Sequence, residues 1–193
     1  MRVSPTSLSF LASAVLMTVV LAACEDPFAP QLRPVPEEPS TAVLFDFETS
    51  DLRSPSAFDV AGRREVRTDQ TAGWDFLLGR DEGEFEFRPR NVVLGGNSTA
   101  GLQPFDGTFE ELRMAPEGGY VTDETVAVEV GDVFSARSRQ EGGGFGIGCL
   151  RFLKLEVTAL DPQEGSATIR YLGNPNCGRR TLVAGATGSE QEQ

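Results

Sequence analysis

The residues that could carry chemistry are mostly carboxylates, because the chain contains no histidine. Histidine is the commonest general base and metal ligand, so its absence excludes Ser-His-Asp and Cys-His catalytic sites. The pairs Glu84/Glu86 and Glu110/Glu111 have the side chains that glycoside hydrolysis needs. Glu84 and Glu86 alternate with phenylalanines, however, which favours the polar face of a strand. We therefore predict no catalytic residues, no metal site and a protein that is not an enzyme.

Cys149 and Cys177 are predicted to form a disulfide that closes a β-hairpin. A turn centred on Gln163, in the segment DPQEG at 161–165, pairs residues whose numbers sum to 326. This register brings Cys149 opposite Cys177, and directly opposed residues can approach closely enough for a bond between their sulfurs. Such a bond requires an oxidising, exported compartment.

The side chains of the two predicted strands agree with this register. Leu155 opposite Tyr171 and Val157 opposite Ile169 form an apolar face. The other face is polar, and it pairs Glu156 with Arg170 and Thr158 with Thr168. The alternation of apolar and polar residues is that of a sheet with one buried side.

Cys24 is the third residue with a predicted chemical role. An apolar run from Leu8 to Ala23 follows a short segment that contains Arg2, and Cys24 is preceded by small residues. The run is short for a membrane span and resembles a signal peptide over residues 1–23. The segment LAAC at 21–24 resembles the lipobox of bacterial lipoproteins, in which the cysteine is lipidated. The alternative is an ordinary secretory signal with a coincidental cysteine.

The remaining chain divides into three regions. Residues 24–41 are proline-rich and lack apolar periodicity, which predicts a disordered tether. Residues 42–184 form the predicted domain, and residues 185–193 a polar tail. The net charge of −12 argues against nucleic acid and anionic lipid surfaces as partners.

The domain is predicted to be all-β, a single antiparallel domain that ends in the disulfide-linked hairpin. Short apolar runs alternate with turn signals, and 21 glycines interrupt them. Residues 95–101 and 140–148 are predicted loops, and 106–113 a short helical turn. Besides the hairpin, the predicted strands are 42–48, 57–67, 74–79, 84–94, 120–121, 125–130 and 133–139.

Several segments, in order, resemble the HmuY family of bacterial haem-binding lipoproteins. They are WDFLL at 74–78, NVVLGGN at 91–97, FEELRMAPEGGYVTD at 109–123 and DVFSAR at 132–137, followed by the terminal hairpin. The resemblance implies an all-β, lipid-anchored protein of the cell envelope, at the outer membrane or cell surface. It also implies haem as the ligand and a possible outer-membrane receptor as partner.

The family's axial histidines are absent, so the resemblance leaves other iron ligands and other functions open. Haem iron also accepts methionine or tyrosine, which makes Met114 and Tyr120 the candidate cofactor-binding residues. The alternative for both is a packing role. A scaffold of this type without haem ligands would bind another small molecule or a surface partner. The opening LFDFETSDL at 44–52 resembles carbohydrate-binding modules, which is a further alternative.

Overall fold

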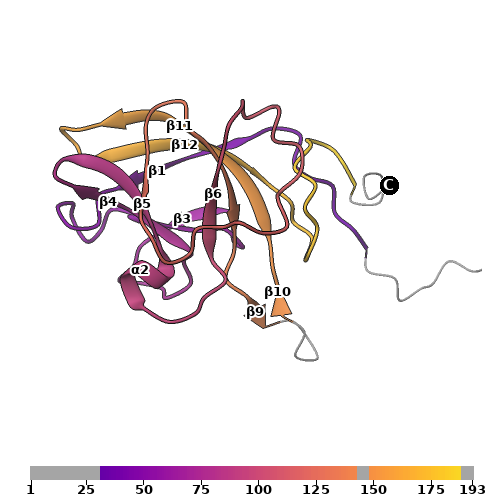
Figure 1. Cartoon of the computed structure of the whole chain (residues 1–193), viewed down its shortest axis with the longest axis horizontal. Coiled ribbons are helices and arrows are strands. Elements are labelled where there is room, and N and C mark those ends of the chain that lie inside the picture. The colour runs from indigo at the N-terminus through magenta and orange to yellow at the C-terminus, as the bar shows by residue number, and fades with distance from the viewer. Residues whose placement is uncertain (1–30, 143–147, 188–193) are drawn as a thin grey trace, which may run out of the picture. The chain divides into compact units, whose positions relative to one another are not determined.

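The computed structural model describes residues 31–142 and 148–187 of the chain (Figure 1). The predicted signal peptide at 1–23, the lipidation site Cys24 and the first part of the tether lie outside these residues. So do residues 143–147 of the predicted glycine-rich loop and residues 188–193 of the predicted tail.

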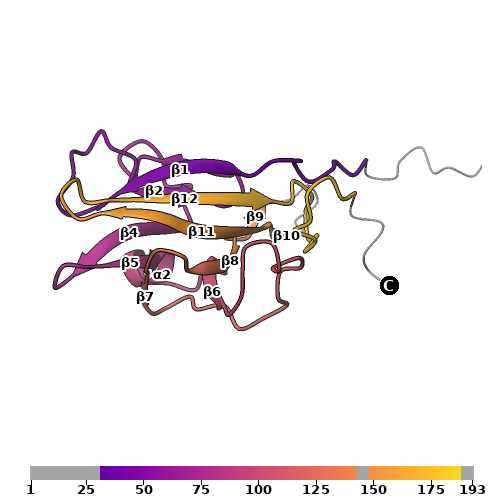
Figure 2. The ribbon, with the colours of Figure 1, turned by 90° about the horizontal axis from the view of Figure 1, so that it is seen from above.

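The described residues form two five-stranded antiparallel sheets, which confirms the all-β prediction. The first sheet has β12 between β1 and β11, as Figure 2 shows. In spatial order its strands are β1 (Ser40–Phe45), β12 (Ser166–Gly173), β11 (Phe152–Asp161), β8 (Val133–Arg137) and β6 (Gly101–Phe105).

The second sheet is built from shorter strands, and its middle is the hairpin of β4 and β5. In spatial order its strands are β3 (Arg64–Val66), β2 (Ala57–Asp59), β4 (Phe76–Asp81), β5 (Glu84–Pro89) and β7 (Val126–Ala127). A separate pair consists of β9 (Glu141–Gly142) and β10 (Gly148–Cys149), and the short helix α2 spans Arg90–Leu94.

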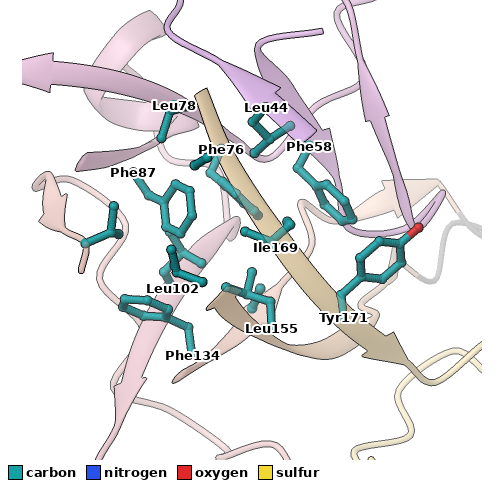
Figure 3. Close-up of a cluster of buried hydrophobic side chains, with 14 of the residues drawn as sticks. Leu44, Phe58, Phe76, Leu78, Phe87, Leu102, Phe134, Leu155, Ile169 and Tyr171 are labelled. Atoms are coloured by element: carbon teal, nitrogen blue, oxygen red, sulfur yellow. The ribbon is translucent and has the colours of Figure 1, made fainter. Parts of the chain in front are cut away.

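The main core lies between the two sheets and is rich in phenylalanine (Figure 3). Phe87 of β5 and Phe134 of β8 meet with ring centroids 5.8 Å apart, and Phe58 of β2 meets Tyr171 of β12 at 4.9 Å. Both contacts join one sheet to the other, so the fold is a β-sandwich. Phe85 and Phe87 are buried in this core, as their alternation with glutamates predicts.

A second buried cluster covers the outer face of the first sheet. Phe152 of β11 and Leu172 of β12 point away from the main core and pack in this cluster. The loop that follows β6 contributes Phe109 and Leu112, and the segment after β12 contributes Leu182. The outer face that the sequence predicts to be polar is therefore partly buried, because the loop after β6 and the segment after β12 cover it.

The hairpin register is confirmed over most of its length. Leu155 pairs with Tyr171, Val157 with Ile169 and Glu156 with Arg170, and Glu156 forms the predicted ion pair with Arg170. The predicted pairing of Thr158 with Thr168 is wrong. A β-bulge at this point places Ala159 opposite Thr168, and the Thr158 hydroxyl donates to the Thr168 carbonyl at 3.1 Å.

The predicted disulfide between Cys149 and Cys177 is present, with Cα atoms 5.3 Å apart. The register predicts that both residues belong to one continuous ladder, and this prediction is wrong. The ladder of β11 with β12 ends at Leu153 and Gly173, whereas Cys149 belongs to β10. Beyond the end of this ladder the two segments still contact each other, since the Gly178 amide donates to the Leu150 carbonyl at 2.8 Å.

Several predicted strands differ from the structure in their limits, and β6 is not among the predicted strands. Residues 57–67 form two strands, β2 and β3, which pair with each other. The strand predicted at 84–94 ends at Pro89, which cannot donate to a ladder, and α2 follows. Residues 101–105, predicted as loop at their start, form β6.

The predicted tether is shorter than expected, because its second half packs on the domain. Val35 is buried, accepts a hydrogen bond from the Gly185 amide and donates to the Ala186 carbonyl. The Arg33 amide donates to Asn176 Oδ1 at 2.9 Å, and Ser40 begins β1. Proline content predicts an extended backbone here correctly, but not the partners that hold it.

Candidate functional site

Tyr120 is a buried anchor of the second cluster. Its hydroxyl oxygen lies 2.9 Å from Ser135 Oγ and donates to the Pro116 carbonyl at 3.2 Å. The Arg137 guanidinium lies 4.5 Å from the centroid of its ring, and burial raises the pKa of the phenol. The oxygen that an iron would need is therefore held in two hydrogen bonds.

Met114 lies at the surface, with 39% of the residue exposed. Its backbone forms an isolated bridge with Thr181, which fixes the position of the segment after Arg113. The thioether is accessible, but neither Met114 nor Tyr120 lines the cavity described next. The structure thus places one candidate iron ligand at the surface and the other in a core.

The cavity lies on the outer face of the first sheet and has a volume of about 340 Å³. Its volume falls at the small end of the range of small-molecule sites. Charged groups come from three residues, Glu110, Arg113 and Lys154. The apolar lining comes from Pro39, Phe109, Leu172, Val183 and Ala184.

Three parts of the chain build this cavity. Lys154 of β11 and Leu172 of β12 are cross-strand neighbours and supply its floor. The segment from Phe109 to Arg113 covers one side, and Phe109 and Leu112 anchor it in the second cluster. The Leu182 amide donates to the Arg113 carbonyl at 2.8 Å, so the segment after β12 is attached to the same cover.

Lys154 is the unusual residue of the cavity, because a lysine is rarely so buried without an acidic partner. The residue is 5% exposed, and its Nζ donates to the Phe109 carbonyl oxygen at 2.7 Å. In the described part of the chain, no carboxylate forms an ion pair with it. Burial lowers the pKa of the ammonium. The Glu110 carboxylate opposes this effect, and Arg170 and Arg113 each act with burial to a smaller extent than Glu110 opposes it.

Sequence reasoning does not identify Lys154 as a site residue. Its position in the alternation places it on the same outer face as Glu156, where a charged residue is expected to be solvated. The segment around Phe109 covers it, and the contact between Lys154 and Phe109 joins residues 45 positions apart. No local pattern contains this information.

A second buried charged group holds the two sheets together. Asp75 is almost fully buried and accepts hydrogen bonds from the amides of Val60 and Arg139, each at 2.7 Å. Arg139 Nη1 lies 3.2 Å from both Asp75 Oδ1 and Asp59 Oδ1. This group is fully engaged in internal contacts, which indicates a structural role.

The only tryptophan of the chain, Trp74, is also buried. The Arg90 guanidinium lies 5.1 Å from the centroid of its ring. Sugar-binding surfaces favour exposed aromatic rings, so this residue gives no support to a carbohydrate platform.

Within residues 31–142 and 148–187, no group of three or more acidic or cysteine side chains is arranged to hold a metal ion. The same residues contain no helix with the length and apolar character of a membrane span. Neither a protein-family model nor a curated protein significantly matches this chain.

Proposed function

We propose that the chain is a non-enzymatic, exported lipoprotein that binds a small ligand in the cavity above Lys154. The observation that carries the proposal is a buried ammonium on the floor of an otherwise largely apolar cavity, with one hydrogen-bond acceptor among the residues that the structure describes. Small-molecule sites combine apolar walls with a few polar groups that orient the ligand. A charged group that is not needed for an ion pair within the protein fits this role.

The predicted export and lipid anchoring of the chain support the same proposal. The segment before Cys24 has the features of a lipoprotein signal, and the disulfide is typical of exported proteins. In this proposal the lipid on Cys24 anchors the domain in the bacterial cell envelope, at the outer membrane or cell surface. Labelling cells with a radioactive fatty acid should mark the protein, and Cys24→Ser should abolish the label.

Haem is the second candidate ligand, with a HmuY-like architecture and transfer to an outer-membrane receptor. The observation in its favour is that the accessible Met114 directly follows Arg113, a residue of the cavity wall. Cationic groups can pair with carboxylates such as the haem propionates. Methionine is a known axial ligand of haem iron.

The two candidates are distinguished by titrating the purified protein with haem and then with small apolar molecules. A saturable one-to-one shift of the haem absorption band, weakened by Met114→Ala, would support haem. Stabilisation by a smaller molecule without a saturable haem signal would support the cavity alone. A protein that binds neither haem nor any small molecule of neutral, anionic or cationic class would contradict the proposed function.

A further inference from the structure

The charged side chains around the cavity leave a positive charge uncompensated. Glu110 is the only acidic residue of the lining, and its carboxylate pairs with Arg170 at 3.1 Å. Arg170 also pairs with Glu156 on the same face. Lys154 and Arg113 therefore face the cavity without a carboxylate of their own in the described part of the chain. This local excess is notable in a chain with a net charge of −12.

The hydrogen-bonding capacity of Lys154 is only partly used. An ammonium has three N–H donors, and the described residues offer Nζ a single acceptor, the carbonyl of Phe109. An anionic oxygen in the cavity would use a second donor and form a charge-assisted hydrogen bond. In an apolar surrounding such a bond is stronger than at an exposed surface.

The rest of the lining is suited to hydrocarbon. Leu172 is 3% exposed, and Phe109 is 2% exposed. Pro39, Val183 and Ala184 supply further apolar surface nearer the opening. A ligand therefore meets a cation at the floor and mostly apolar groups along the walls, which also include Glu110 and Arg113.

We propose that the cavity binds a monoanionic amphiphile, namely a carboxylate on a small hydrocarbon body. The carboxylate accepts a hydrogen bond from Lys154 Nζ, Arg113 adds a second positive charge, and the hydrocarbon contacts Leu172 and Val183. If each heavy atom takes about 30 Å³, the volume share of a water, the cavity holds about ten of them. This inference rests on the proposed function and names its ligand class.

The test is a calorimetric titration of the full chain with octanoate, octanol, octyl phosphate and octylammonium. We expect saturable binding of octanoate, and binding of octanol at least about tenfold weaker, since charge-assisted hydrogen bonds are worth more than one factor of ten. Octylammonium should not bind. If octanol or octylammonium binds as well as octanoate, the inference fails while the proposed function stands. Preference for octyl phosphate over octanoate also overturns the carboxylate assignment. If no probe binds, the inference fails, and the proposed function fails with it only when the haem titration is negative as well.

Variants connect the binding to Lys154. Lys154→Met should weaken octanoate binding about tenfold or more while leaving octanol binding nearly unchanged. Arg53→Gln removes an exposed positive charge elsewhere and is the matched control, so its octanoate affinity should equal that of the wild type. Ala184→Trp, at an exposed edge of the lining, should block the cavity without altering the core. Unchanged octanoate affinity in both Ala184→Trp and Lys154→Met would overturn the inference. If Lys154→Met does not fold, unchanged octanoate affinity in Ala184→Trp alone would overturn it.

Discussion

Lys154 Nζ lies 2.7 Å from the carbonyl oxygen of Phe109 and 4.4 Å from the centroid of the same residue's ring. One residue of the covering segment thus supplies both an acceptor and a π face to a buried cation. The Arg170 guanidinium lies 4.3 Å from that ring as well. Two cations of the sheet contact one aromatic residue, so the cover and the charges beneath it stabilise each other.

Lys154→Met should stabilise the unliganded protein. The substitution removes a charge from an apolar surrounding and retains most of the side-chain volume, and the desolvation of a buried ion costs several kcal/mol that its contacts must repay. Loss of the hydrogen bond to the Phe109 carbonyl and of the cation–π contact with its ring opposes this by about 1 to 2 kcal/mol. We expect a net gain of about 1 kcal/mol in the free energy of unfolding at neutral pH, the low end of what such replacements give. Urea denaturation measures it, and a clear loss of stability would contradict the interpretation of Lys154 as strained by burial.

The stability difference between Lys154→Met and the wild type should shrink as the pH rises. Burial lowers the pKa of Lys154 below its ordinary value of 10.5, so the unfolded chain binds more protons between the two values. The free energy of unfolding of the wild type therefore rises as the pH rises from the folded-state pKa to the unfolded-state pKa. The cost of burying the charged ammonium is complete only below the folded-state pKa. The tyrosines act in the opposite direction, because burial raises the pKa values of Tyr120 and Tyr171. They are common to both proteins, so the difference in unfolding free energy isolates Lys154. A difference that stays constant up to pH 10.5 would contradict this.

The sequence predicts structure that depends on neighbouring residues, such as the pairing within a hairpin. It does not predict burial that depends on contacts with segments distant in the sequence. Val157 and Ile169 are paired correctly because alternation and the Asp161–Gly165 turn fix their register together. The bulge at Thr158 adds one residue to one strand, which leaves no signature in a pattern of period two. The burial of Lys154 depends on the covering segment around Phe109, and the packing of Val35 depends on Gly185 and Ala186. The cavity therefore could not be predicted, although the hairpin of β11 and β12 beneath it could.

Asp75→Ala should be strongly destabilising, by about 3 kcal/mol or more. The substitution leaves the buried amides of Val60 and Arg139 without their acceptor and removes one of the carboxylates beside the Arg139 guanidinium. Asp75→Asn keeps the shape and one acceptor oxygen, so its loss should be smaller. Thermal unfolding of both variants tests this order, and equal stabilities would argue against a hydrogen-bonded role for the carboxylate.

Tyr120→Phe separates a packing role of this residue from a role as iron ligand. The hydroxyl pairs with the buried Ser135 Oγ and the Pro116 carbonyl, so its removal should cost about 1 to 2 kcal/mol of stability. A double-mutant cycle with Ser135→Ala should show that the two losses are coupled. If the variant keeps full stability but loses a haem absorption shift, the oxygen is a ligand and not an internal anchor.

The disulfide between Cys149 and Cys177 should contribute substantially to the free energy of unfolding. It closes a loop between residues 28 positions apart, for which loop constraint gives about 3.6 kcal/mol. The variant Cys149→Ser with Cys177→Ser avoids leaving a free thiol, and its unfolding midpoint should match that of the reduced wild type. Both should fall below the midpoint of the oxidised protein, because the hairpin ladder ends at Leu153 and Gly173 and the bond is the covalent link between the two segments beyond it. Two free thiols at Cys149 and Cys177 in protein isolated from the cell envelope would contradict the paired state and remove one support for export.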